Sequence, residues 1–138
     1  MPAKILHHCN TVEECYEFML GYAAQGRSSD ENEKPGGGQI REFLERATQA
    51  IAGLTEECAK AVDEHRLEPA QKFRSFLAVL DRDAGSSLAS IELVLAQPSI
   101  SSQLVDNLNG SIHLRALLTD TFLLGEVLRS QLAAKTGR

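Results

Sequence analysis

The residues with the clearest potential for chemistry lie close together near the start of the chain. His7, His8, Cys9 and Cys15 place four side chains that can bind a metal ion within a short segment. Imidazole nitrogen and thiolate sulfur are ligands that zinc prefers, so these four residues form our candidate metal site. Their spacing matches structural zinc sites poorly, because such sites set cysteines roughly two to four residues apart and add a second ligand pair downstream. Incidental histidines and cysteines near an N-terminus are the competing explanation.

A helical protein can also assemble a binding site from residues that are distant in the sequence. His7, Cys15, His65 and His113 are the candidates for a metal or small-ligand site of this kind. Cys58 and His65 fall on one helix face, but seven residues at about 1.5 Å each place them about 10 Å apart, too far to bind one ion. We therefore interpret Cys58 as a small buried apolar residue and His65 as a group near the negative end of a helix dipole.

The remaining residues of chemical interest lack the context that a catalytic motif requires. Gly36, Gly37 and Gly38 precede a helix, but no Lys-Ser or Lys-Thr pair follows them, so they do not form a phosphate-binding loop. No Glu-x-x-His pair, which a di-iron bundle would use, occurs in the sequence. The serines have no nucleophile-elbow context. We therefore predict no cofactor and favour a non-enzymatic protein over an enzyme.

The charge distribution and the composition argue against two classes of partner. The 138 residues carry a formal net charge of −5, and no cluster of lysine and arginine offers the basic surface that nucleic acids require. The longest apolar stretch, Ile112 to Leu128, includes His113, Arg115, Asp120 and Glu126, which are costly in a lipid bilayer. We expect neither nucleic-acid nor membrane binding. Three cysteines without a secretory signal predict a cytoplasmic protein with reduced thiols.

The spacing of apolar residues predicts an all-α fold in a single domain spanning residues 1–138. A capping box at Thr11 and Glu14 predicts a short first helix that ends before Gly26, and residues 26–38 read as a flexible, glycine-rich loop. An unbroken seven-residue repeat between residues 39 and 66 is typical of helices packed in a bundle. A helix over 69–97 follows, either bent at Gly85 or split there into two. The predicted fold is a four-helix bundle, up-down-up-down, with one short and three long helices.

The last helical region, which residues Asn109 and Gly110 can interrupt, carries more apolar side chains than one bundle face needs. Such a helix is either the centre of its own core or the contact surface for a second chain. Our leading hypothesis is that this helix is a contact surface. The protein would then be a protein–protein interaction or oligomerisation module that forms a homodimer or binds a protein partner. The alternative is a metal- or ligand-binding bundle. The predicted interface residues are Leu114, Leu117, Leu118, Phe122, Leu124 and Leu128.

Overall fold

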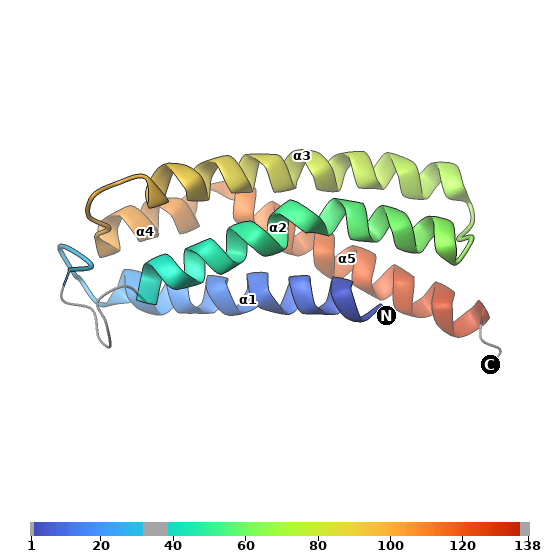
Figure 1. Ribbon diagram of the computed structural model, residues 1–138, viewed down its shortest axis with the longest axis horizontal. Coiled ribbons are helices and arrows are strands. Elements are labelled where there is room, and N and C mark those ends of the chain that lie inside the picture. Colours follow the sequence, from blue (N-terminus) through green and yellow to red (C-terminus); the bar gives the residue numbers. More distant parts are fainter. Residues whose placement is uncertain (1, 32–38, 136–138) are drawn as a thin grey trace.

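The computed structural model describes residues 2–31 and 39–135, and this part of the chain is entirely helical, without a strand. Five helices follow one another. They are α1 (Ala3–Ala24), α2 (Gln39–Glu64), α3 (Ala70–Leu95), α4 (Ser102–Gly110) and α5 (Ile112–Lys135). Figure 1 shows α1, α2 and α3 as long rods, each reversing the direction of the one before it. The all-α prediction is confirmed, whereas the predicted division into one short and three long helices is not, because the first helix is long and α4 is the short one.

The first helix begins eight residues before the predicted capping residue. Cys9 and Ile5 are buried and lie about one and two turns before Val12 on the same helix face, so the apolar stripe starts at Ile5. Thr11 is therefore inside the helix, where its hydroxyl donates to the carbonyl of His7 at 3.0 Å. The predicted capping box at Thr11 and Glu14 is wrong, because the helix begins at Ala3 and the polar residues around Asn10 lie on its exposed side.

The two longest helices agree more closely with the sequence pattern. Helix α2 begins at Gln39, as expected, and buries the repeating residues from Ile40 to Ala61. Helix α3 continues through Gly85 without a break, because Ala84, Ser87 and Ile91 keep the buried face in phase across the glycine. The alternative of two shorter helices at this point is thereby excluded.

The last helical region is divided at the predicted place. Ser101 caps the start of α4: its side-chain oxygen accepts a hydrogen bond from the Leu104 amide at 3.0 Å. Helix α4 ends at Gly110, and α5 starts at Ile112 after one intervening residue. The break changes the partners of the chain: α4 packs mainly against α1, while α5 packs mainly against α3 and makes few contacts with α1.

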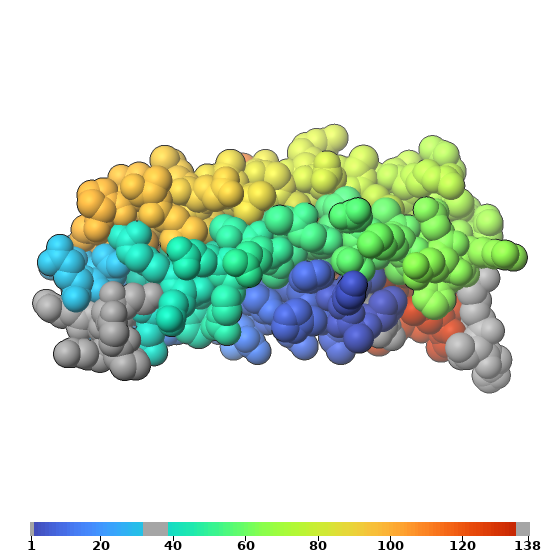
Figure 2. Space-filling model, viewed as in Figure 1, coloured from blue at the N-terminus to red at the C-terminus, as the bar shows by residue number. Residues whose placement is uncertain are grey.

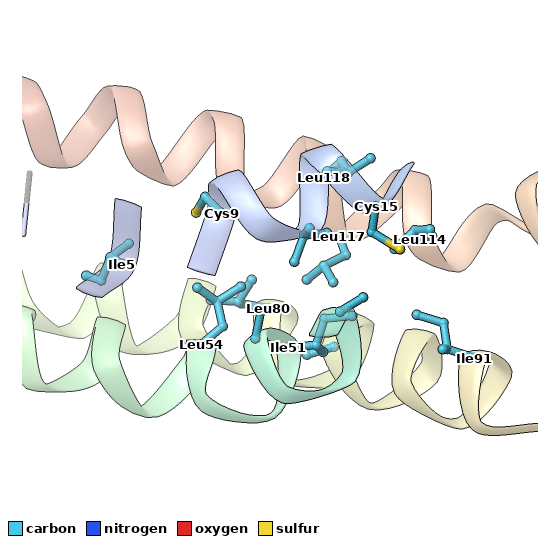
Figure 3. Packing of buried hydrophobic residues seen from close by; sticks show 14 of the residues in the cluster. Ile5, Cys9, Cys15, Ile51, Leu54, Leu80, Ile91, Leu114, Leu117 and Leu118 are labelled. Atoms are coloured by element: carbon cyan, nitrogen blue, oxygen red, sulfur yellow. The ribbon is translucent and has the colours of Figure 1, made fainter. Parts of the chain in front are cut away.

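Aliphatic side chains from all five helices form one continuous core. Figure 3 shows Leu114 and Leu117 of α5 and Cys15 of α1 turned toward the interior, opposite Ile51 of α2 and Leu80 of α3. In Figure 2, α2 lies across the middle of the visible face and α5 emerges mainly near the C-terminal end of the molecule. The core side chains with no measurable exposure are Met19, Ile40, Leu44, Leu54, Leu80, Ile91, Ile100, Val105, Leu117 and Leu128.

Tyr22 links this core to the segment between α3 and α4, and its substitution provides a first prediction. Its buried hydroxyl donates to the carbonyl of Ile100 at 2.6 Å. Replacing Tyr22 with phenylalanine leaves that carbonyl without this donor, so we expect the free energy of unfolding to fall by about 1 kcal/mol. Urea denaturation measures the change. The matched variant Tyr16→Phe, at a half-buried position, is expected to change stability by no more than about 0.5 kcal/mol; an equal loss in both variants would contradict the role assigned to the Tyr22 hydroxyl.

Candidate functional site

The structure does not bring the predicted metal ligands together. Cys9 and Cys15 face the core with 7% and 1% exposure, whereas His7 is exposed and His8 is half-buried. Burial raises the pKa of the Cys9 thiol to about 11 and that of Cys15 to about 12, so both are protonated at neutral pH. Metal binding requires thiolates, and the two buried thiols resist that ionisation. Among residues 2–31 and 39–135, no three His, Cys, Asp or Glu side chains lie close enough to hold a metal ion.

The set proposed from distant residues is also dispersed. His65 follows the last residue of α2 and is exposed, with its amide bonded to the carbonyl of Ala61 at 3.0 Å. His113 is exposed in the first turn of α5, and Cys15 is buried in the middle of α1. The three glycines at positions 36–38 lie outside the described residues. The geometry of the described chain therefore offers no centre at which these side chains could meet one ligand.

The predicted interface residues separate into two groups. Leu114, Leu117, Leu118, Leu124 and Leu128 have at most 7% exposure and belong to the core of the single chain. Phe122 alone of the six is exposed, at 57%. The apolar residues of α5 thus fall into two classes: five leucines are buried in the core of the single chain, and other apolar side chains are exposed. A second chain can contact only the exposed side chains, so of the six predicted residues only Phe122 can belong to an interface of the folded chain. Whether such an interface exists stays a prediction.

Among the described residues of α5, four large apolar side chains are exposed: Ile112 at the start of the helix and three others farther along it. Phe122, Leu123 and Val127 are 57%, 54% and 37% exposed and lie within two turns of helix. We call these three residues the α5 ridge. Scattered apolar residues are normal on a protein surface, whereas adjacent ones beside a hollow are typical of contact surfaces.

A groove runs along one side of the α5 ridge, between α3 and α5, with a volume of about 400 Å³. We call it the α3–α5 groove. Its walls are mainly apolar, and the lining residues are Pro69, Lys72, Phe73, Phe76, Leu123, Leu124, Val127 and Gln131. Sequence reasoning missed the α3 wall, although the pair Phe73 and Phe76 at helical spacing was a visible signal. Which helix would lie beside α5 was not known from the sequence.

A second cavity, of about 390 Å³, lies on the opposite side of the ridge between α1 and α5. Helices α1 and α5 make few contacts with each other, and this cavity lies between them. Leu6, 44% exposed, lies on the α1 side, and Phe122 lies on the α5 side. The residues of the α5 ridge therefore line two hollows: Leu123 and Val127 line the α3–α5 groove, and Phe122 lines the cavity between α1 and α5.

Two carboxyl groups approach each other across α3 and α5. Asp120 is 9% exposed, and its carboxyl group is close enough to that of Asp83 to affect its ionisation. Burial, together with the neighbouring carboxyl group and negative charge of Asp83, raises the pKa of Asp120 to about 7. The second oxygen of Asp120, Oδ2, is buried without a hydrogen-bond partner in the described structure.

A polar network connects the segment after α1 with the start of α2 and the end of α3, and the sequence pattern did not indicate it. Asp30 is 4% exposed; its Oδ2 accepts from the Arg41 guanidinium at 2.7 Å and its Oδ1 from the Ile100 amide at 2.9 Å. Arg41 also donates to the carbonyls of Leu95 and Gln97. Residues 26–31 of the predicted flexible loop are thus tied to the start of α2 and the end of α3. Residues 32–38 of that loop lie outside the described residues, so its flexibility stays a prediction.

None of the described helices has a stretch long and apolar enough to cross a lipid bilayer. Comparison of the chain with protein-family models, curated proteins and solved structures finds no match. The candidate site is therefore defined by its geometry alone: the α5 ridge, the two hollows beside it and the acidic pair next to the α3–α5 groove.

Proposed function

We propose that this protein is a non-enzymatic helical module that forms a homodimer through the α5 ridge and the α3–α5 groove. In this proposal α4 and α5 together take the place of the fourth helix of an up-down-up-down bundle, and the break between them tilts α5 so that one face remains open. The observation that carries the proposal is the exposure of Phe122, Leu123 and Val127 beside an apolar groove. Three free thiols, Cys9, Cys15 and Cys58, suit a reducing compartment, and we propose the cytoplasm as its location.

A second copy of the chain suits this surface because the surface is self-complementary. A two-fold symmetric contact joins the same patch on both subunits, so each copy must offer both a protrusion and a hollow. The α5 ridge is the protrusion, and the grooves beside it are the hollows. An interface of standard size buries about 800 Å² on each partner, more than three side chains supply. The contact must therefore extend from the ridge to the wall of α3 and toward Leu6 of α1.

The charges on α5 also permit an antiparallel pairing with a second copy. If two α5 helices pair about a point between Leu124 and Gly125, Phe122 of one copy lies level with Val127 of the other. Glu126 lies level with Leu123, so no like charges between Arg115 and Arg129 oppose each other. Like-charge juxtaposition is a common obstacle to association, and this register avoids it although the chain carries a net charge of −5.

Sedimentation velocity over a wide concentration range tests the proposal with the purified full chain. We expect a reversible monomer–dimer equilibrium, and we expect Leu123→Asp to raise the dissociation constant at least about thirtyfold, because it places a charge at the centre of the contact. Leu123 is 54% exposed in the single chain, so the variant should still fold, which circular dichroism verifies.

The matched control is Leu20→Asp, which introduces the same charge at a 48% exposed leucine of α1, away from the groove. This variant should dimerise like the unmodified chain. A strictly monomeric unmodified protein at the highest concentration would contradict the proposal. So would equal weakening of the dimer by both variants, since that would show a general charge effect and no specific surface.

A further inference from the structure

The two ends of the α3–α5 groove differ in chemistry. Helices α3 and α5 run in opposite directions (Figure 1), and the side-chain amide of Gln131 donates to the carbonyl of Glu68 at 3.3 Å. The start of α3 therefore lies beside the end of α5, which places Lys72 and Gln131 at the same end of the groove. Phe76 and Leu123 line the other end. The groove thus has one polar, cationic end and one purely apolar end.

The cationic end has positive charge that the described chain does not neutralise. Lys72 is exposed, and no ion pair among the described residues includes it. The first turn of α3 contains no acidic residue, and no side chain caps it. The positive end of this helix dipole therefore adds to the charge of Lys72. A negatively charged group is the partner that this end of the groove favours.

The apolar walls extend from the cationic end along both helices. On α5, Leu123, Val127 and Gln131 follow at four-residue spacing, so they form one row that changes from apolar to polar. This row is about 12 Å long, and the α3 wall from Pro69 to Phe76 is about 10 Å long. An extended alkyl chain, with C–C bonds of about 1.5 Å in a zigzag, covers this length in about nine bonds. The volume of about 400 Å³ is within the range of small-ligand sites.

The cavity between α1 and α5 has the opposite electrostatic character, although its volume is similar. Its lining includes Glu13 and Glu126. Its one arginine, Arg129, is already paired with Glu126 at 2.6 Å. An apolar anion would therefore favour the α3–α5 groove over this cavity.

We propose that the α3–α5 groove binds a straight-chain carboxylate of about ten carbons, with its carboxylate beside Lys72 and its alkyl chain between the apolar walls. The amide of Gln131 has a second N–H that can donate to the carboxylate. This site does not depend on the proposed homodimer. Leu123 and Val127 belong to both surfaces, however, so the ligand and a second copy of the chain compete for them.

Isothermal titration of the full chain with decanoate tests the proposal, at a protein concentration low enough to dissociate a dimer. We expect saturable binding. Hexanoate should bind at least about tenfold more weakly, because four methylene groups fewer leave water. Lys72→Gln should weaken decanoate binding about threefold, the loss expected for an exposed ion pair, and should leave the affinity for 1-decanol unchanged. Arg74→Gln, at an exposed position of α3 outside the groove, is the matched control and should bind decanoate like the unmodified chain.

A second pair of variants tests the apolar wall. Leu123→Asp should weaken decanoate binding at least about tenfold, because it removes apolar surface and adds a like charge. Leu20→Asp, outside the groove, should have no effect. Circular dichroism verifies that each variant is folded.

The outcomes separate this site from the proposed homodimer. Absence of saturable decanoate binding overturns the ligand site, as does equal decanoate affinity in Lys72→Gln and Arg74→Gln or in Leu123→Asp and Leu20→Asp. A chain that dimerises without binding decanoate retains only the homodimer proposal. A strictly monomeric chain that binds decanoate with these responses retains only the ligand site.

Discussion

Replacing Asp30 with alanine is expected to lower the free energy of unfolding by about 3 kcal/mol at neutral pH. The substitution leaves the buried Ile100 amide without its acceptor and removes the partner of Arg41, whose side chain is 28% exposed. An unsatisfied buried donor costs about 1 to 3 kcal/mol, and the loss of one member of a buried ion pair costs about 3 to 5 kcal/mol. Partial exposure of Arg41 to water keeps the expected sum near the lower end of that range.

Urea denaturation of the unmodified chain, Asp30→Ala and the neighbouring control Glu31→Ala measures this effect. Glu31 is exposed, so its substitution should change stability by no more than about 0.5 kcal/mol. Asp30→Asn, which keeps an oxygen acceptor but not the charge, should give an intermediate loss. If Asp30→Ala and Glu31→Ala unfold at the same urea concentration, the polar network does not stabilise this end of the molecule.

The effect of Asp30 should also depend on pH in a defined direction. Burial by itself raises the pKa of Asp30, but the Ile100 amide and the Arg41 guanidinium outweigh burial and hold the pKa below its usual value of 3.8. A lowered pKa in the folded state means that the stabilisation is complete above 3.8 and is lost as the pH falls through the folded-state value. The stabilities of the unmodified chain and of Asp30→Ala should therefore converge at strongly acidic pH.

The second large effect distinguishes the core of the single chain from the proposed interface. Leu117→Ala should destabilise the protein by about 3 kcal/mol, because Leu117 has no measurable exposure and its truncation leaves a cavity in the core. Phe122→Ala should change the stability of the monomer by no more than about 0.5 kcal/mol, since the ring is 57% exposed. Dimerisation should respond in the opposite way, with the main loss of affinity in Phe122→Ala.

Chemical denaturation at low protein concentration measures the first quantity, and sedimentation of each folded variant measures the second. A stability loss for Leu117→Ala that vanishes when the protein is diluted to the monomer would mean that this leucine is covered by a second chain and not by α1 and α3. An equal, large loss of monomer stability in Phe122→Ala would show that the ring is buried in solution, which would remove the α5 ridge as a contact surface.

The candidate site shows why only part of it could be predicted. The pattern on the last helix indicated surplus apolar surface, and Phe122 is indeed uncovered. The pattern could not separate Phe122 from Leu117, because both are apolar at helical spacing and differ only in what packs against them. Asp120 and Asp83 are 37 positions apart in the sequence and look like ordinary surface charges until α3 and α5 are placed side by side.

The amino-acid sequence by itself determined the helical class, the extent of α2, the continuation of the apolar stripe through Gly85 and the break near Gly110, because these depend on spacing and on residues close together in the chain. The tertiary structure alone decided that α1 begins at Ala3, that Asp30 is buried in an ion pair with Arg41, and that α5 packs mainly against α3. The physical reason is that burial is a property of neighbours. A side chain's spacing shows which face it occupies, but only the packing of distant helices determines whether that face meets core, water or a second chain.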